Sequence, residues 1–138
     1  MRRSHEHALL LLDRARGDVR VLERVIQDAD VPDWAAGFHA QQAVEKAIKA
    51  VLSNRAVEYP RTHNLAALLD QVHGGGLALP PDAGHLPQLT PFGTLLRYED
   101  EVGVGPSTTL DRGLAAEWVR RTMVWAESLV GGREGTSD

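Results

Sequence analysis

The sequence contains no cysteine. This absence excludes disulfide bonds, thiolate metal ligands and a cysteine nucleophile. Aromatic residues are also scarce, at 5% of the 138 residues, although 43% of the chain is hydrophobic. The core must therefore be built mostly from leucine, valine and alanine, and a chain of this length predicts one domain.

Long apolar runs and a basic excess are missing as well. No run approaches the roughly 20 residues of a membrane-spanning helix, and the run Ala8–Leu12 is too short for a secretory signal. We therefore expect a cytoplasmic protein that does not enter a membrane. The formal net charge is −4, from 19 acidic and 15 basic residues. Nucleic-acid binders usually carry a basic excess, so only a local basic patch could serve such a partner here.

Several enzyme motifs are absent. The run Gly74–Gly76 has no following Lys-Ser or Lys-Thr, so it does not form a phosphate-binding loop, and neither Gly-x-Ser-x-Gly nor His-Glu-x-x-His occurs. His5 and His7 are two positions apart and do not share a helix face, which argues against a metal site there. We expect neither a metal nor a cofactor.

Apolar residues recur at helical spacing, and no segment of useful length alternates like a strand. Helices are predicted at about 4–29, 32–53 and 63–73, with a short one at about 91–97. A last helix should run from about 108 to the glycine pair at 131–132. Thr62 and Thr108 are the expected N-caps of the third and last helices. The fold class is therefore all-α, an up-and-down antiparallel bundle of four to five helices over residues 1–132, with a disordered tail at 133–138.

One carboxylate interrupts an apolar helix face. Glu45 shares one side of its predicted helix with Phe38 and Ile48, and Gln41 and Lys49 flank it. A buried carboxylate needs a cation or several hydrogen-bond donors. Two interpretations follow: a ligand-binding or catalytic carboxylate, or a structural pair with a cation from another helix or from a second protomer.

Three further side chains are candidates for a polar site. His63 opens the third predicted helix, where it can either take part in a site or serve as a capping or packing residue. Arg97 ends the short predicted helix, from which it can reach inward to Glu45 or outward to a phosphate. Tyr98 can pack with its hydroxyl at the surface. With Glu45 and Lys49, these residues form our set of ligand-binding candidates.

The last predicted helix carries two tryptophans. Trp118 and Trp125 lie at helical spacing on an otherwise amphipathic segment. They suggest a homodimer with helix 32–53 or the last helix near the interface, and the alternative is that both belong to the core of a monomer.

Three sequence blocks, taken together, resemble the HEPN superfamily. They are AQQAVEKAIKA at Ala40–Ala50, THNL at Thr62–Leu65, and Arg97-Tyr98, and the resemblance extends over about residues 4–130. It implies a small helical bundle that usually dimerises. Many HEPN proteins are RNA-cleaving toxins, and in prokaryotes they are often encoded beside a minimal nucleotidyltransferase that acts as the antidote. The superfamily has also been regarded as nucleotide-binding.

The resemblance leaves the activity open. The nuclease members carry an arginine followed, after four to six residues, by a histidine; Arg97 matches the arginine, but Val102–Val104 occupies the histidine positions. Our first hypothesis is a HEPN-like homodimer acting with a nucleotidyltransferase in a toxin–antitoxin-like or stress-response system, with nucleotide or RNA bound near Arg97. The second is a metal-independent endoribonuclease toxin that uses a different base, such as His63. The third is a structural interaction module without catalysis.

Overall fold

The computed structural model describes residues 2–94 and 109–136. Over these ranges the chain forms four α-helices and one 3-10 helix, and no strand. The elements are α1 (Arg2–Val25), α2 (Asp33–Asn54), α3 (Leu65–Gly74), η1 (Leu86–Thr94) and α5 (Arg112–Thr136). The prediction of an all-helical bundle is confirmed. None of the helices in the described ranges is long and apolar enough to span a bilayer.

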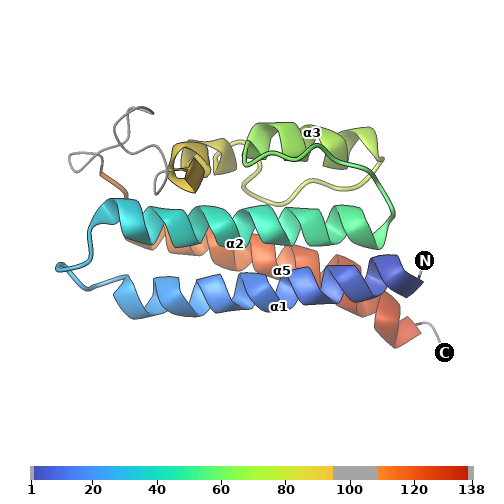
Figure 1. Ribbon diagram of the computed structural model, residues 1–138, viewed down its shortest axis with the longest axis horizontal. Coiled ribbons are helices and arrows are strands. Elements are labelled where there is room, and N and C mark those ends of the chain that lie inside the picture. The colour runs from blue at the N-terminus through green and yellow to red at the C-terminus, as the bar shows by residue number, and fades with distance from the viewer. Residues whose placement is uncertain (1, 95–108, 137–138) are drawn as a thin grey trace.

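The three long helices α1, α2 and α5 pack side by side, and α3 and η1 cover the opposite side of α2 from α1 (Figure 1). Arg112 at the start of α5 donates to the carbonyl oxygen of Val25 at the end of α1. Arg16, earlier in α1, pairs with Glu127, later in α5. Helix α1 is therefore antiparallel to α5 as well as to α2, whereas α3 and α5 run in the same direction as α2 (Figure 1). Packed helices therefore run in opposite directions only where α1 lies against α2 and α5.

Helix α2 occupies the centre of the bundle because apolar or small residues lie on nearly every side of it. Its buried positions include five alanines, which allow neighbouring helices to approach closely, and they are Ala36, Ala40, Ala43, Ala47 and Ala50. Larger side chains such as Ile48 and Leu52 are fully buried. A helix buried on several sides can hold a polar side chain away from water, and Glu45 is placed in this way.

Arg112 fastens the start of α5 to the turn between α1 and α2. Its guanidinium donates to the carbonyl oxygens of Val25 (2.6 Å), Asp28 (3.1 Å) and Val31, and Nε donates to Oδ1 of Asp33 (2.7 Å). Asp33 also accepts from the backbone N–H of Leu110 at 3.0 Å. The hydrogen bond from Arg112 holds the pKa of Asp33 below its usual value. One side chain therefore adds hydrogen bonds to three carbonyl oxygens at and just beyond the end of α1.

Several predicted helix ends were wrong. Helix α3 is capped by Asn64, whose side chain accepts from the N–H of Ala67. Thr62 lies two residues too early for this role and instead accepts from the N–H of Asn64. Asp111 accepts from the N–H of Leu114 at the start of α5. Helix α5 continues through the predicted glycine stop to its last residue at 136. Glycine in a helix costs about 1 kcal/mol relative to alanine, which is too little to end a long packed helix.

The short helix predicted at about 91–97 is instead the 3-10 helix η1, which begins five residues earlier. Pro91 lies inside it and lacks the N–H that an α-helical hydrogen bond would need. Glycines let η1 pack tightly on α2. Gly37 faces the ring of Phe92, and a β-carbon at Gly93 would lie 2.6 Å from Cδ of Gln41. The two chain segments therefore touch directly beside Glu45.

Both tryptophans of the last helix belong to the core. Trp118 is 6% exposed and Trp125 is 9% exposed, and Nε1 of Trp125 donates to the carbonyl oxygen of Ala78 at 3.0 Å. Leu114, about one turn before Trp118, is 47% exposed. The tryptophans therefore provide no argument for a dimer.

Candidate functional site

Glu45 is buried where α2 faces the start of α3, with only 4% of its surface exposed. Its carboxylate accepts three hydrogen bonds: from Nζ of Lys49 to Oε2 at 2.8 Å, from Nδ1 of His63 to Oε1 at 2.9 Å, and from Nε2 of Gln41 to Oε1 at 2.9 Å. Gln41 and Lys49 lie one turn before and one turn after Glu45, so helical geometry alone brings them to the carboxylate. We call these four residues the Glu45 cluster.

The cluster keeps Glu45 ionised. Burial by itself would raise the pKa of Glu45, because it removes water from the charged form. The hydrogen bonds from Lys49, Gln41 and His63, together with the charge of Lys49, outweigh that effect and hold the pKa below its usual value. The carboxylate is therefore a fixed negative charge inside the bundle.

Two contacts with described residues help to hold His63 in place. It lies just before α3, and its carbonyl oxygen accepts from Nε2 of Gln41 at 3.0 Å. An ionised carboxylate only accepts hydrogen bonds, so the Nδ1 atom that contacts Glu45 carries the proton. This fixes the ring orientation and places the second nitrogen, Nε2, on the far side of the ring from the carboxylate. The same arrangement orients catalytic and ligand-binding histidines in many proteins.

Polar side chains continue outward from the cluster. Gln42 donates from Nε2 to Oε1 of Gln41 at 2.7 Å. The ammonium of Lys49 lies 5.7 Å from the centre of the Tyr59 ring, and the Tyr59 hydroxyl lies 3.3 Å from Oγ of Ser53. The site is thus a polar strip between the second half of α2 and the segment that leads into α3.

The structure brings together three of the five candidate residues. Glu45, Lys49 and His63 are in contact, because Lys49 and His63 each donate a hydrogen bond to the Glu45 carboxylate. Arg97 and Tyr98 lie outside the described residues, so the predicted pairing of Arg97 with Glu45 stays a prediction. Glu45 is also satisfied by its own chain, so it provides no separate argument for a second protomer.

A second polar cluster was missed by the sequence analysis. Asp18 of α1 is bound by Nδ1 of His39 at 2.9 Å and by Nζ of Lys46 at 2.6 Å, both from α2. His39 and Lys46 are two turns apart on one face of α2, which is visible in the sequence. Their meeting with Asp18 depends on how α1 packs against α2, and no local spacing reveals it.

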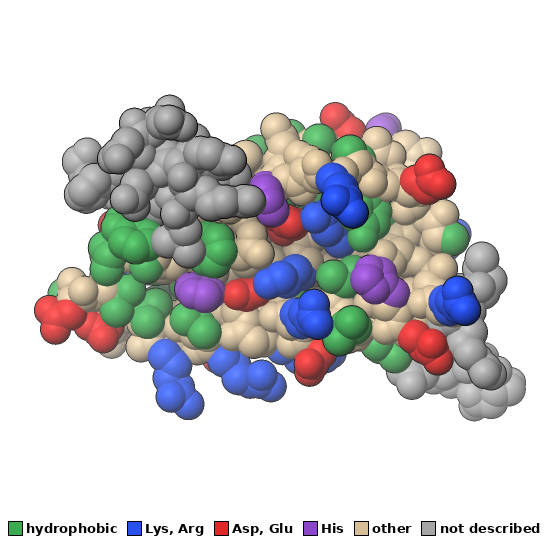
Figure 2. Space-filling view, in the orientation of Figure 1, with side chains coloured by type: hydrophobic (Ala, Val, Ile, Leu, Met, Phe, Trp, Pro, Cys, Tyr) green, Lys and Arg blue, Asp and Glu red, His purple; other side chains and the backbone are tan. Residues whose placement is uncertain are grey.

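Each of the two clusters surrounds one carboxylate with a lysine and a histidine. Figure 2 shows the result on the face that carries α1 and α2: cationic, acidic and histidine side chains are mixed, without a large area of one sign. Within residues 2–94 and 109–136, no three His, Asp or Glu side chains converge as a metal site would require. The described arrangement can hold an anion through Lys49 or position the imidazole of His63 for proton transfer.

Comparison with known proteins identifies the family. The family model for the HEPN domain matches residues 8–124, a range that runs from α1 into α5 and includes the whole Glu45 cluster. No match was found among curated proteins or among solved structures. The resemblance carried by the three sequence blocks is confirmed, since the match covers most of the chain. This chain therefore belongs to the HEPN domain family.

Proposed function

We propose that this HEPN protein binds a phosphate of a nucleotide or of single-stranded RNA at the Glu45 cluster. We further propose that it forms a homodimer and acts with a nucleotidyltransferase partner in a toxin–antitoxin-like or stress-response pair. The observation that supports binding is a buried, ionised Glu45 that fixes Lys49 and His63 beside the start of α3. Fixed donors bind an anion without first having to be ordered.

The side chains of the Glu45 cluster differ in solvent exposure in a way that favours binding of an anion. The Glu45 side chain is 6% exposed, that of Lys49 is 17% exposed and that of His63 is 38% exposed. The negative charge therefore lies deepest, and the two nitrogen-bearing groups lie closer to solvent. An ammonium has three N–H donors, of which the contact with Glu45 uses one. A phosphate oxygen at Lys49 would meet a positive charge whose position the carboxylate already fixes.

Arg97 completes the proposed site. Gly93, which packs against Gln41, precedes Arg97 by only four residues, and four extended residues span at most about 14 Å. Arg97 is thus within chain reach of the cluster. We propose that its guanidinium contacts the same phosphate, with Tyr98 beside it.

Binding is tested with fluorescently labelled single-stranded RNA and with ATP, using purified protein at fixed salt concentration. Lys49→Ala should weaken binding about 10- to 150-fold, since a hydrogen bond to a charged group is worth about 1.5–3 kcal/mol. Lys46→Ala is the matched control, because it removes the same charge from the same helix but at the Asp18 cluster. Equal losses in both variants, or no binding by the wild type, would contradict the proposed site.

The proposed partner has a separate test. The gene adjacent to this one should encode a minimal nucleotidyltransferase, and the two proteins should copurify after coexpression. A neighbouring gene of another kind, together with no copurification, would contradict the partnership and leave phosphate binding to be judged alone.

The contact between Glu45 and His63 also favours a second candidate function, a metal-independent endoribonuclease. A carboxylate-oriented imidazole is a suitable general base, and such a base contributes about 10²–10⁴-fold to a rate. We nevertheless expect little or no cleavage, because Val102–Val104 occupies the positions of the usual histidine. The assay is incubation of single-stranded RNA with the purified protein and excess EDTA. Strong cleavage that is lost in both Arg97→Ala and His63→Asn would establish the second candidate instead.

A further inference from the structure

The Glu45 cluster fixes the orientation of two glutamine side chains. Gln41 is fully buried, and its Nε2 donates to the carboxylate of Glu45 at 2.9 Å and to the carbonyl oxygen of His63 at 3.0 Å. Because an ionised carboxylate and a carbonyl oxygen only accept hydrogen bonds, both N–H groups of Gln41 must face them. The Oε1 atom of Gln41 therefore faces Gln42, whose Nε2 donates to it at 2.7 Å.

Gln42 consequently presents a fixed donor and acceptor at the surface of α2. The residue is partly exposed, and its contact with Gln41 uses one of its two N–H groups. The other N–H and the Oε1 atom of Gln42 have no hydrogen-bond partner among the described residues. A flip of the Gln42 amide would set its oxygen against that of Gln41 and lose their hydrogen bond. The free donor and acceptor are therefore ordered before any ligand binds.

An aromatic ring lies one helical turn before Gln42 on the same side of α2. Phe38 is partly exposed, and its ring packs against that of His39 with the centroids 5.3 Å apart and an interplanar angle of 81°. Aromatic side chains at sites for single-stranded nucleic acid stack on unpaired bases. Lys49 lies two turns after Gln42 on this side, about 10 Å further along the helix axis. An aromatic ring, a donor–acceptor pair and a cation therefore follow one another along α2.

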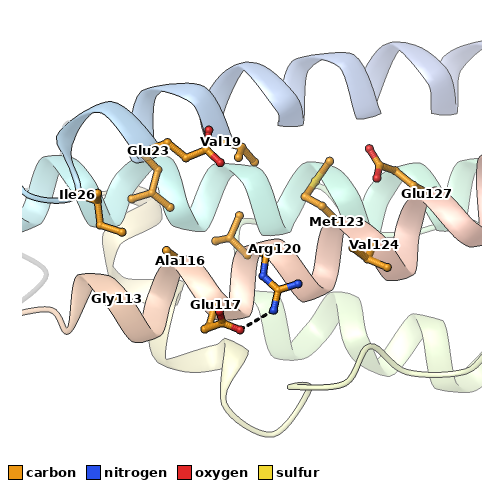
Figure 3. Close-up of a pocket in the computed structure, with 12 residues that line it drawn as sticks. Val19, Glu23, Ile26, Gly113, Ala116, Glu117, Arg120, Met123, Val124 and Glu127 are labelled. Carbon is orange, nitrogen blue, oxygen red and sulfur yellow. Dashed lines mark hydrogen bonds and ion pairs between the residues drawn. The ribbon is translucent and has the colours of Figure 1, made fainter.

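The groove between α1 and α5 does not offer this combination (Figure 3). It has a volume of about 450 Å³, and its lining carries three glutamates, Glu23, Glu117 and Glu127, against one arginine, Arg120, which pairs with Glu117. Among its described lining residues there is neither an aromatic ring nor a side-chain amide. A phosphate would meet an excess of negative charge in that groove, so the outer side of α2 is the better site for a nucleotide.

We propose that Gln42 and Phe38 form a nucleobase subsite beside the phosphate site at Lys49. This inference rests on the proposed function and specifies its ligand as a nucleotide or RNA strand with an unpaired base. The amide of Gln42 hydrogen-bonds to the edge of the base, as glutamine does with N6 and N7 of adenine, and the ring of Phe38 stacks on its face. A base inside a duplex is stacked between its neighbours and cannot reach the ring.

Pairs of ligands with and without a base test the subsite. Isothermal titration calorimetry at fixed salt concentration compares ATP with inorganic tripolyphosphate, and a short single-stranded RNA with its abasic counterpart. The wild type should bind the base-containing member of each pair about 5- to 150-fold more tightly, the range for one bidentate contact between an amide and a base. Gln42→Ala should remove most of this preference. Lys49→Ala should weaken both members of each pair by the same factor, because both carry phosphate.

Gln71→Ala is the matched control, because Gln71 is also a partly exposed helical glutamine but lies on α3, outside the Glu45 cluster. It should keep the preference of the wild type. Phe38→Ala should reduce the preference, and Phe38→Tyr, which retains an aromatic ring, should keep it. An unchanged preference in Gln42→Ala, or equal affinity of the wild type for ligands with and without a base, would overturn the subsite while phosphate binding stands. Failure of the wild type to bind any of the four ligands would overturn both.

Discussion

Loss of the Glu45 carboxylate should be among the most destabilising single changes in this protein. Glu45→Leu leaves the ammonium of Lys49 without its anion, and it removes the acceptor for Nδ1 of His63 and Nε2 of Gln41. Breaking a buried charged pair in this way typically costs about 3–5 kcal/mol. Urea unfolding followed by circular dichroism gives the free energy of unfolding. Glu6→Leu is the control, since Glu6 is also helical but exposed, and its change should stay within about 0.5 kcal/mol.

A double-mutant cycle identifies the partner. Lys49→Met should also destabilise the protein, because it leaves the buried carboxylate with less compensation. The double variant Glu45→Leu/Lys49→Met should recover about 1–3 kcal/mol relative to the sum of the two single losses. Additive losses, or a cost below about 1 kcal/mol for Glu45→Leu, would refute the reasoning.

The acid dependence of stability provides a second check on Glu45. Its pKa is lowered in the folded state, so below neutral pH the unfolded chain binds the proton more readily. The resulting stability is fully present above the usual glutamate pKa of 4.5 and is lost as the pH falls through the pKa of the folded state. Glu45→Gln should reduce this slope. It should not abolish it, because the pKa of Asp33 is lowered as well. An unchanged acid slope would contradict the assignment.

Four further changes test the packing of the bundle by urea unfolding. Arg112→Ala should cost about 2–4 kcal/mol, because several acceptors lose a charged donor; a loss under about 1 kcal/mol would contradict its role in fastening α5. Gly37→Ala should cost about 1–3 kcal/mol, because the β-carbon would overlap the buried ring of Phe92, whereas Gly17→Ala meets nothing within 4 Å and should stabilise α1 by about 0.5–1 kcal/mol. Asp18→Ala should cost about 1–2 kcal/mol, and a neutral result would show that its pairing between α1 and α2 is immaterial.

Features that depend on neighbours along the chain could be predicted from the sequence. Helical periodicity predicted the long helices, because one apolar face repeats every 3.6 residues whatever the fold around it. The buried residues of α3, such as Leu68 and Val72, follow this spacing. The burial of Glu45 and the presence of Gln41 and Lys49 beside it follow from spacing within a single helix.

Features that depend on distant segments could not be predicted in this way. His63 reaches Glu45, and Asp18 reaches Lys46, only because particular helices pack side by side. The same holds for Arg112, which acts where three segments meet, and for the shared direction of α2, α3 and α5. Contacts within a helix are fixed by the geometry of one turn, whereas contacts between helices depend on which apolar faces bury each other. Several arrangements satisfy one apolar pattern, so only the packed structure selects among them.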